Sequence, residues 1–478
     1  MKIAIIGMGV AGVSVLKEMS KYPIFKDQEI VIYDSPQTIG TGLPYQPDTE
    51  VLLLNQPADT MSMDQDKKLG FAEWVEEKKG YTDAAKIHFP RPWYGEYLRE
   101  VMDQAIQALN ATVILEKVTD LDLLDSGKIL VHSPSSVEEF DLVHLCVGHM
   151  AYQDPYDLYG HPHYIHNPYP AKEKLQVIPS GSRVGIIGTG LTGLDMMRCL
   201  KLLQEDMKIY FVSDTGRFTT VRVHEPALNL QYVTLENLEL EKKKNNGFVS
   251  LDRMIEWFEK ECESLGIHLS ETIEKFGQGT KEQLEKQLID NENFGVLQAI
   301  IHHMDYYLPD YWLALNERDK QRYRQEYKNL FELIRTSIPQ ETVNNLLTWW
   351  DNGQVSVFKD MESVTEFPTE FEVGFSDGKK LKVDYLINST GQNKQIKISK
   401  YNSALLNNTL NKRILQPEFF DGVQVTWPDS CAVSQRYGVI ENLFVHGQII
   451  EGLQYGNNSA GMLLRHAEEV VKKLVEKM

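Results

Sequence analysis

The sequence predicts an α/β fold with two parallel sheets. In each sheet, one apolar strand is followed directly by a glycine-rich turn. At the start of the chain, the apolar run KIAIIG (2–7) leads into the stretch 7–12, GMGVAG. The same pattern recurs near the middle of the chain, where RVGIIG (183–188) leads into 188–193, GTGLTG. The length of 478 residues also exceeds one ordinary domain of about 150 residues. These observations predict two similar α/β units rather than one large domain.

The first glycine-rich turn lies between two predicted strands. A helix is expected from the turn to about Lys21, and the strand EIVIYD ends at Asp34, about 20 residues beyond the last glycine. In this βαβ context the three glycines permit a tight turn, backbone approach to a pyrophosphate and close helix packing. The free N–H groups and positive dipole end of the helix favour phosphate. The predicted dinucleotide site comprises Gly7, Gly9, Val10, Ala11, Gly12, Asp34 and Ser35.

The second turn has the same context, which makes both units Rossmann-like. A helix is predicted through about Leu203, and the strand KIYFVSD ends at Asp214. The second predicted site comprises Gly188, Gly190, Leu191, Thr192, Gly193, Ser213 and Arg217. Two complete fingerprints indicate two adenine dinucleotides, or one dinucleotide and a relic.

Asp34 bears on the identity of the first cofactor. A carboxylate at this position accepts hydrogen bonds from ribose hydroxyls and repels a 2′-phosphate, which favours FAD or NAD over NADP. The alternative is a strand end that merely carries an aspartate.

Two further apolar strands that close in glycine suggest the domain borders. They are 141–149, which contains Gly148, and 383–393, which contains Gly391, and each follows a predicted hairpin. We therefore predict an FAD-binding part at 1–150, an NAD(P)-binding domain at 151–382 and a second FAD-binding part at 383–478. A helix-rich insertion at about 222–350 is expected to cap the active site or form the substrate pocket. The alternative is a bundle that only packs or dimerises.

Composition excludes several classes of protein. The net charge of −19 argues against a nucleic-acid partner, and no window reaches the roughly 20 apolar residues of a membrane span. The four cysteines form no C-x-x-C pair, which argues against a dithiol centre and indicates a reducing, cytoplasmic location. A homo-oligomer stays an open alternative.

Together, these elements resemble the two-dinucleotide-binding-domain flavoproteins. The stretches 38–63, 89–98 and GTGLTGLD (188–195) look like a broad bacterial family of FAD–NAD(P)-binding proteins. That family is related to the N-hydroxylating and Baeyer–Villiger flavin monooxygenases. The resemblance implies FAD together with NADPH or NADH as cofactors.

The resemblance also implies further cofactor-binding residues. These are Gly42, Asn55, Gln56, Arg91, Val118, Gly148, Gly391, Gly447 and Gln448, with Trp93 as a neighbour of the flavin or its phosphates. Val118 would read adenine through its backbone, and Gln448 replaces the aspartate that the family places on the ribityl chain. The alternatives are a turn role for Asn55 and a core role for Trp93. His149 and Asn55 are the candidate catalytic residues, although His149 has a structural alternative.

The nicotinamide preference depends on the residues that follow the second unit's strand 208–214. Asp214 would repel a 2′-phosphate, whereas Arg217 and Arg222 could bind it. The alternative is that both arginines are ordinary surface charges. NADPH and NADH therefore both remain candidates.

The predicted activity is hydride transfer from NAD(P)H to FAD, as in an N-hydroxylase-like monooxygenase acting on a small molecule. The alternatives are a reductase or dehydrogenase without oxygen insertion, and a non-catalytic redox sensor. The monooxygenase motif F-x-G-x-x-x-H is only partly matched, because Gly160 is present but Tyr164 takes the histidine position. His161, His163 and His166 lack the further ligands that a metal needs, so no metal is predicted. His302 and His303 are expected to be structural or to line a pocket.

Overall fold

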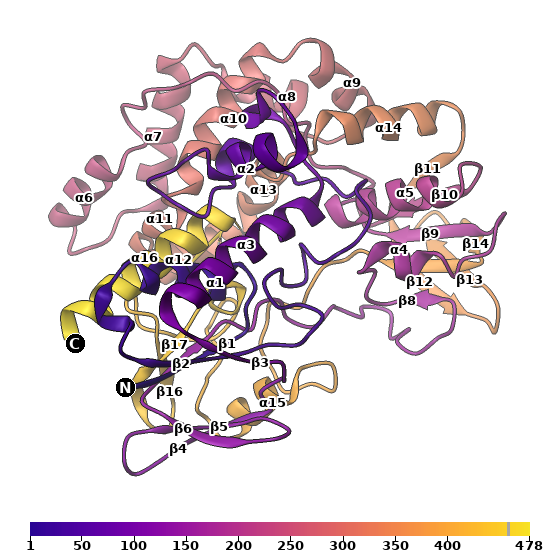
Figure 1. Cartoon of the computed structure of the whole chain (residues 1–478). Helices are drawn as coiled ribbons and strands as arrows, with labels where there is room; N and C mark the ends of the chain where they lie inside the picture. Colours follow the sequence, from indigo (N-terminus) through magenta and orange to yellow (C-terminus); the bar gives the residue numbers. More distant parts are fainter. Residues whose placement is uncertain (457–458) are drawn as a thin grey trace. The chain divides into compact units, whose positions relative to one another are not determined.

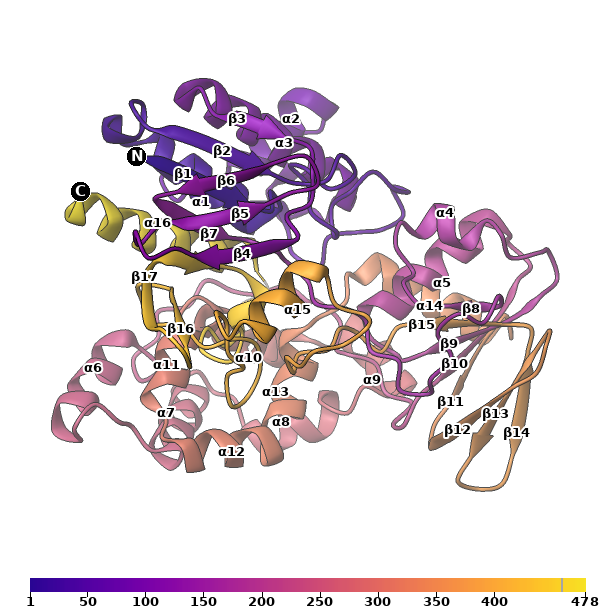
Figure 2. The same cartoon turned by 90° about the horizontal axis from the view of Figure 1, so that it is seen from below.

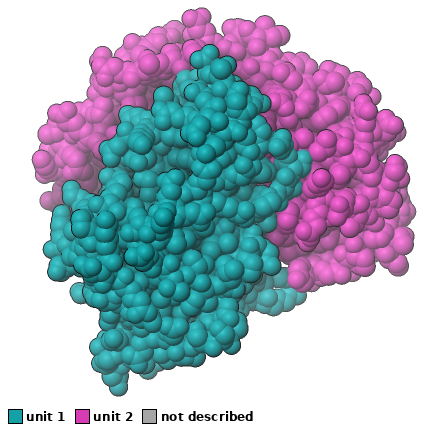
Figure 3. Space-filling view, in the orientation of Figure 1, with its two compact units in different colours: residues 1–50, 56–152, 392–478 teal, residues 51–55, 153–391 magenta. Residues whose placement is uncertain are grey.

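The computed structural model describes residues 1–456 and 459–478 and divides the chain into two compact units. The first unit contains residues 1–50, 56–152 and 392–478, and the second contains 51–55 and 153–391 (Figure 3). The chain therefore returns to the first unit near residue 391 rather than at the predicted residue 383. The reason is that the strand at 385–388 pairs within the sheet of the second unit.

The first unit is built on a six-stranded sheet in the order β16-β17-β7-β1-β2-β3 (Figure 1). Its strands are β1 (Lys2–Ile6), β2 (Glu29–Tyr33), β3 (Thr112–Ile114), β7 (Leu142–Leu145), β16 (Cys431–Ser434) and β17 (Gly438–Val445). All neighbouring strands are parallel except β16 and β17. Parallel strands are buried on both faces, which explains why β1, β2 and β7 are almost entirely apolar, apart from the charged first residues Lys2 and Glu29 and the buried His144.

Helices and a small second sheet complete the first unit (Figures 1 and 2). The helices are α1 (Val10–Ser20), α2 (Gly70–Lys79), α3 (Arg91–Leu109), α15 (Ala404–Asn411) and α16 (Ala460–Lys477), with short 3-10 turns at Pro23–Phe25, Ala58–Thr60, Ala84–Lys86 and Gln448–Ile450. The second sheet consists of β4 (Asp120–Leu123), β5 (Ile129–His132) and β6 (Val137–Phe140). The predicted hairpin is confirmed, because β4 and β5 pair antiparallel across the turn at 125–127.

The second unit has a parallel five-stranded sheet in the order β11-β10-β9-β15-β8. Its elements are β8 (Tyr164–Ile165), α4 (Ala171–Leu175), β9 (Arg183–Ile187), α5 (Leu191–Leu203), β10 (Lys208–Val212), β11 (Val355–Phe358) and β15 (Tyr385–Asn388). The antiparallel sheet β12 (Met361–Glu366), β13 (Phe371–Phe375) and β14 (Lys380–Val383) follows β11. Its β13–β14 pair is the second predicted hairpin.

A layer of helices fills the predicted insertion of the second unit (Figure 1). The helices are α6 (Leu235–Lys244), α7 (Leu251–Ser264), α8 (Leu269–Phe276), α9 (Lys281–Ile289), α10 (Glu292–Asp305), α11 (Leu308–Ala314), α12 (Glu317–Glu326), α13 (Lys328–Arg335) and α14 (Gln340–Asp351). Except for α12, these helices contribute apolar side chains that join the strands β9 and β10 in one core cluster. The insertion is therefore packed on the five-stranded sheet of the second unit rather than tethered as a separate bundle.

Two buried glutamines hold the extended segment 220–223 that enters this helical layer. The side-chain oxygen of Gln287 accepts the Val221 N–H at 2.6 Å, and that of Gln298 accepts the Val223 N–H at 3.1 Å. On the other side, the Ile338 N–H donates to the Thr220 carbonyl at 2.7 Å. Both glutamine side chains are essentially inaccessible to solvent, so their amides replace the partners that a sheet would give this backbone.

Candidate functional site

The first glycine-rich turn has the geometry that its sequence predicts. Gly7 has φ +94°, and a Cβ added there would overlap the Cys146 carbonyl oxygen. A Cβ at Gly12 would overlap the Gly7 carbonyl oxygen. Only glycine fits these two positions, because the first needs a left-handed backbone and the second a close helix–strand approach. The turn is therefore a fixed backbone cradle at the end of β1.

Helix α1 points uncapped N–H groups into this cradle. Its N-cap is Gly9, which provides no capping side chain, and no acidic residue lies in its first turn, which begins Val10-Ala11-Gly12. Gly42 lies directly against Gly9, since a Cβ on Gly9 would be 3.3 Å from the Gly42 Cα. Unsatisfied first-turn N–H groups together with the helix dipole bind phosphate oxygens. The pyrophosphate of a dinucleotide therefore fits the residues present.

Asp34 at the end of β2 fastens the same turn. Its carboxylate accepts the Met8 N–H at 2.6 Å, the Ser35 N–H at 2.6 Å and the Thr38 hydroxyl at 2.8 Å. Ser35 is buried, and its hydroxyl lies 2.8 Å from that of Thr38. A carboxylate has about four acceptor sites, so these three bonds leave room for a ribose hydroxyl. The ribose role of Asp34 stays a prediction.

Val118 is predicted to bind adenine through its backbone, so its backbone N–H and C=O must be available. Its side chain is buried in the core of the first unit. Among the described residues, no hydrogen bond engages its backbone N–H or C=O. A buried residue with both backbone groups free can pair with the edge of a planar base. Val118 therefore stays the predicted adenine contact.

The second turn repeats the first. Gly188 has φ +102°, and a Cβ there would lie 2.8 Å from the Ser389 carbonyl oxygen. Helix α5 starts at Leu191, followed by Thr192 and Gly193, and its N-cap Gly190 carries no capping side chain. The space around Gly190 is open, because a Cβ there would meet no atom within 4 Å. This cradle also fits a pyrophosphate.

The loop after β10 separates the two candidate arginines. Arg217 is exposed, and among the described residues its guanidinium has no side-chain partner. Arg222 instead forms an ion pair of 2.6 Å with Glu225 and contacts His302 at 3.2 Å. Arg222 is thus committed to the helical insertion, whereas Arg217 is available for a phosphate. Asp214 is exposed and its carboxylate accepts the Thr215 N–H at 2.8 Å.

The rest of this loop is fixed by short contacts. The Ser213 hydroxyl accepts the Gly216 N–H at 2.8 Å, and the Thr189 hydroxyl donates to the Arg217 carbonyl. Gly216 abuts Lys359, whose exposed side chain follows strand β11. The sequence alone does not indicate this lysine, because only the pairing of β10 with β11 brings it beside the loop. Lys359 is a second cation beside Arg217.

The glycines that close the two predicted border strands have a left-handed backbone, with φ +72° at Gly148 and +87° at Gly391. The next residue after Gly148 is His149, whose Nδ1 lies 2.7 Å from the side-chain oxygen of Gln392. Burial lowers the pKa of His149, whereas hydrogen bonds with Gln392 and Gln448 act in the opposite direction. Gly447 packs against Ala11 at the start of α1. His149 and Gln448 are therefore joined in the first unit.

The remaining predicted contacts differ in their surroundings. Asn55 falls in the short segment 51–55 of the second unit, while Gln56 lies in the first unit and accepts the Thr60 hydroxyl at 3.4 Å. Arg91 is the first residue of α3. No cofactor role of Asn55, Gln56 or Arg91 is tested by these contacts, and their roles stay predictions.

Trp93 is part of an aromatic cluster. Its Nε1 donates to Glu50 at 2.9 Å, its ring stacks on Phe89 at 5.7 Å, and the Lys79 ammonium lies 4.9 Å from its centroid. Trp93 is half-buried in this cluster, and its place beside the flavin stays a prediction.

The predicted histidine loop serves a structural purpose. His161 Nε2 lies 2.9 Å from the Phe367 carbonyl, and His163 Nδ1 lies 2.9 Å from the Asp384 carbonyl. Within residues 1–456 and 459–478, no group of three His, Cys, Asp or Glu side chains can hold a metal ion. The four cysteines are buried and form no disulfide, and burial raises the pKa of the Cys262 thiol to about 12.

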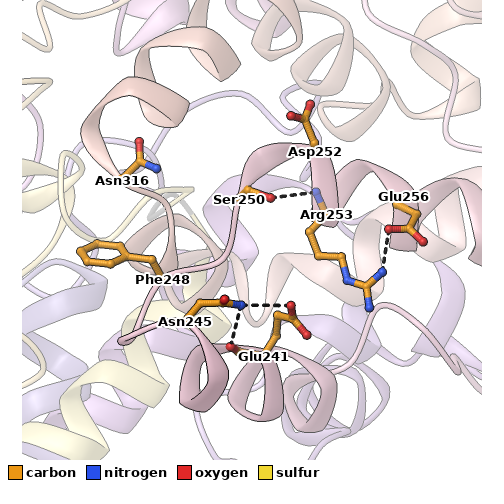
Figure 4. Close-up of a pocket in the computed structure, with 8 residues that line it drawn as sticks. All are labelled: Glu241, Asn245, Phe248, Ser250, Asp252, Arg253, Glu256 and Asn316. Atoms are coloured by element: carbon orange, nitrogen blue, oxygen red, sulfur yellow. Dashed lines mark hydrogen bonds and ion pairs between the residues drawn. The ribbon is translucent and has the colours of Figure 1, made fainter.

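A surface hollow of about 660 Å³ lies in the helical insertion (Figure 4). Its lining residues are Glu241, Asn245, Phe248, Ser250, Asp252, Arg253, Glu256 and Asn316. Its charges pair locally, as in the 2.6 Å contact of Arg253 with Glu256 and the 2.7 Å contact of Asp252 with Arg322.

The helices of the described chain include none long and apolar enough to cross a membrane.

Comparison with known proteins bears on the first 150 residues and on the fold of the whole chain. Residues 4–150 match a family described as FAD-NAD(P)-binding. No curated protein matches the sequence. Among solved structures, the chain is similar to L-lysine 6-monooxygenase from Pseudomonas syringae (13% identity, TM-score 0.61), and the match covers 99% of each chain.

Two further structures are similar over almost their whole length. Ornithine hydroxylase from Pseudomonas aeruginosa has 10% identity and a TM-score of 0.60, with 99% of this chain and 98% of that chain covered. Bacillithiol disulfide reductase from Staphylococcus aureus has 11% identity and a TM-score of 0.53, with 100% and 98% covered. Residues 4–150 are thus similar to an FAD-NAD(P)-binding family, and the chain as a whole has an α/β fold similar to that of these three structures.

Proposed function

We propose that the protein is an FAD-dependent oxidoreductase that takes hydride from NAD(P)H and acts as an N-hydroxylase-like monooxygenase on a small molecule. The observation that carries the proposal is the presence of two glycine cradles with uncapped helix starts, one in each unit. Bound FAD supplies acceptance of hydride and delivery of electrons to oxygen or another acceptor.

The residues of the chain bind and orient rather than react. The α1 and α5 N–H groups hold the two pyrophosphates, and Asp34 holds a ribose. The exposed Arg217 and Lys359 favour the 2′-phosphate of NADPH over NADH, against the charge of Asp214. Buried thiols that form no disulfide fit a reducing compartment, so we place the protein in the cytoplasm.

Two observations favour a monooxygenase over a reductase that relays electrons through its own pair of cysteines. The four cysteines are all buried, form no disulfide and lie far apart in sequence, at positions 146, 199, 262 and 431. Reductases that relay electrons through a dithiol need a reactive, accessible cysteine pair. In addition, similar folds occur in enzymes named for hydroxylation of lysine and ornithine. A small amine is therefore the proposed substrate class.

The reductase alternative retains one specific support, the similar fold of bacillithiol disulfide reductase. Anaerobic addition of NADPH to the FAD-loaded protein should bleach the flavin absorbance. Readmission of oxygen with a panel of small diamines and amino acids should then yield a hydroxylated amine. Bleaching without any oxygenated product would favour the reductase, and no bleaching with either nucleotide would leave only a non-catalytic sensor.

A further inference from the structure

His149 and Gln448 lie at the edge of the first sheet where the cofactor cradle is built. Strands β17, β7 and β1 are neighbours and run parallel, so their carboxyl ends share one edge. His149 follows β7, Gln448 follows β17, and the Gly7 turn follows β1. The chain continues from β1 to β2 on one side while β7 lies on the other, which makes this edge a topological switch point.

The His149 ring lies between two carboxamides. Its Nδ1 is 2.7 Å from the Gln392 side-chain oxygen, and Gln448 supplies the second hydrogen bond. Both hydrogen bonds act to raise the pKa of the ring, so they favour its protonated form, which can donate to both amides. An uncharged imidazole carries only one N–H and can donate only once. One of the two amides must therefore turn its NH2 toward the ring whenever the ring is uncharged.

Gln448 is the amide that is free to turn. The Gln392 backbone is fixed by a β-bridge to Tyr152, and its side-chain oxygen faces Nδ1 at 2.7 Å. The Gln448 side chain has no hydrogen-bond partner other than His149 among the described residues. Rotation of its amide by half a turn exchanges oxygen and nitrogen without moving any other contact.

The orientation of this amide matters because the neighbouring start of α1 offers only donors. The first turn of α1 presents N–H groups, and Gly447 packs against Ala11 in that turn. A cofactor hydroxyl that lies beside this turn therefore needs an acceptor for its hydrogen. The Gln448 oxygen meets that need only when the amide nitrogen faces His149.

We infer that His149 is a positioning residue for Gln448: the uncharged ring turns the Gln448 oxygen toward a hydroxyl of the bound FAD, and the protonated ring draws that oxygen to itself. The inference rests on the proposed FAD site. Burial disfavours the charged ring, and the charged group that acts on it is Glu451, itself paired with Lys394. FAD binding should therefore weaken as pH falls through the pKa of His149.

Two measurements test this coupling. In the apoprotein, nitrogen-15 NMR of the imidazole gives the His149 pKa directly. Gln448→Glu places a carboxylate on the ring and should raise that pKa by at least one unit, whereas Gln448→Leu should lower it. An unchanged pKa in both variants would overturn the coupling, and this measurement needs no cofactor.

The second measurement is the FAD dissociation constant against pH, read from flavin fluorescence. The wild type should bind about tenfold more weakly below the His149 transition than above it, the effect of one misdirected hydrogen bond. His149→Asn should make the profile flat, and Gln448→Leu, which has no oxygen to redirect, should also make it flat. The exposed His303→Asn in the other unit is the control and should match the wild type.

The outcomes separate the inference from the proposed function. A pH profile that survives His149→Asn, with FAD still bound, overturns the positioning role alone. Absence of FAD binding to the wild type at every pH overturns the proposed function and the cofactor part of the inference, and the NMR pKa values then decide the His149–Gln448 coupling by themselves.

Discussion

The Nδ1 of His144 on β7 lies 3.0 Å from the Nε2 of His446, which directly follows β17. His466 on α16 lies next to them, with its ring centroid 5.4 Å from that of His446. All three side chains are buried, and burial lowers the pKa of His144 and of His466 to about 3. The first unit therefore folds around three uncharged imidazoles.

Stability should consequently fall in acid. The unfolded chain takes up these protons near pH 6.5, whereas the folded chain resists them down to about pH 3 for His144 and His466. The contribution of these histidines to the unfolding free energy is thus fully present above pH 6.5. Below that pH it declines by about 1.4 kcal/mol per pH unit for each histidine. Chemical denaturation between pH 7 and 4 measures this slope. His466→Phe keeps the stack on Trp427 and should reduce the slope, while His303→Asn should leave it unchanged.

Glu261 anchors the helical insertion. Its buried carboxylate on α7 accepts the N–H groups of Gln231, Tyr232 and Val233 at 2.6 to 3.0 Å. Glu261→Ala leaves these buried donors without an acceptor and should cost about 3–5 kcal/mol of unfolding free energy. Denaturant unfolding measures the loss, and the exposed Glu259→Ala on the same helix should change stability by no more than about 0.5 kcal/mol. Equal effects of the two changes would contradict the anchoring role.

Gly190 offers a test of nucleotide binding that spares the fold. Its φ of −77° suits any residue, and an added methyl group meets no protein atom within 4 Å. Gly190→Ala should therefore leave the melting temperature nearly unchanged but raise the Kd for NADPH at least tenfold, because the methyl group fills the space of the pyrophosphate. Calorimetry measures both quantities. Gly12→Ala, which would overlap the Gly7 carbonyl, should instead lower the melting temperature, and unchanged NADPH affinity in Gly190→Ala would remove α5 from the site.

Arg217 and Lys359 should decide between the two nicotinamide nucleotides. Removal of either cation costs one charge-assisted contact to the 2′-phosphate and should raise the Kd for NADPH about tenfold, with little change for NADH. Titration of Arg217→Ala and Lys359→Ala with both nucleotides gives the ratio. Lys208→Ala, an exposed change at the opposite end of β10, is the matched control. Equal weakening of NADPH and NADH would place both cations outside the phosphate site.

The sequence predicts those parts of the fold that depend on local patterns. Apolar runs and glycine spacing gave β1, β9 and the starts of α1 and α5, because the fingerprint fixes strand, turn and helix within a few residues. The insertion at about 222–350 is predicted only as helix-rich, and its charged stretch 318–335 forms two helices, α12 and α13, which separate at Tyr327. The charged pattern continues across that break, so only packing could reveal it.

Long-range contacts could not be predicted. His144 and His446 are 302 residues apart, and each reads as one polar residue in an apolar strand. Arg222 seemed equivalent to Arg217 in sequence, yet Glu225 and His302 bind it within the insertion. Lys359 became a site candidate only through the pairing of β11 with β10. Such relationships depend on strand order, which a single sequence does not specify.

The position of β17 between β16 and β7 has a consequence for synthesis on the ribosome. The first unit begins with β1, yet its sheet lacks a central strand until residues 438–445 have been made. Helix α16, which packs on α1, is completed later still, at residue 477. A nascent chain therefore exposes one edge of β7 and one face of α1 throughout translation of the second unit. The unit whose synthesis begins first is therefore also the unit whose synthesis ends last.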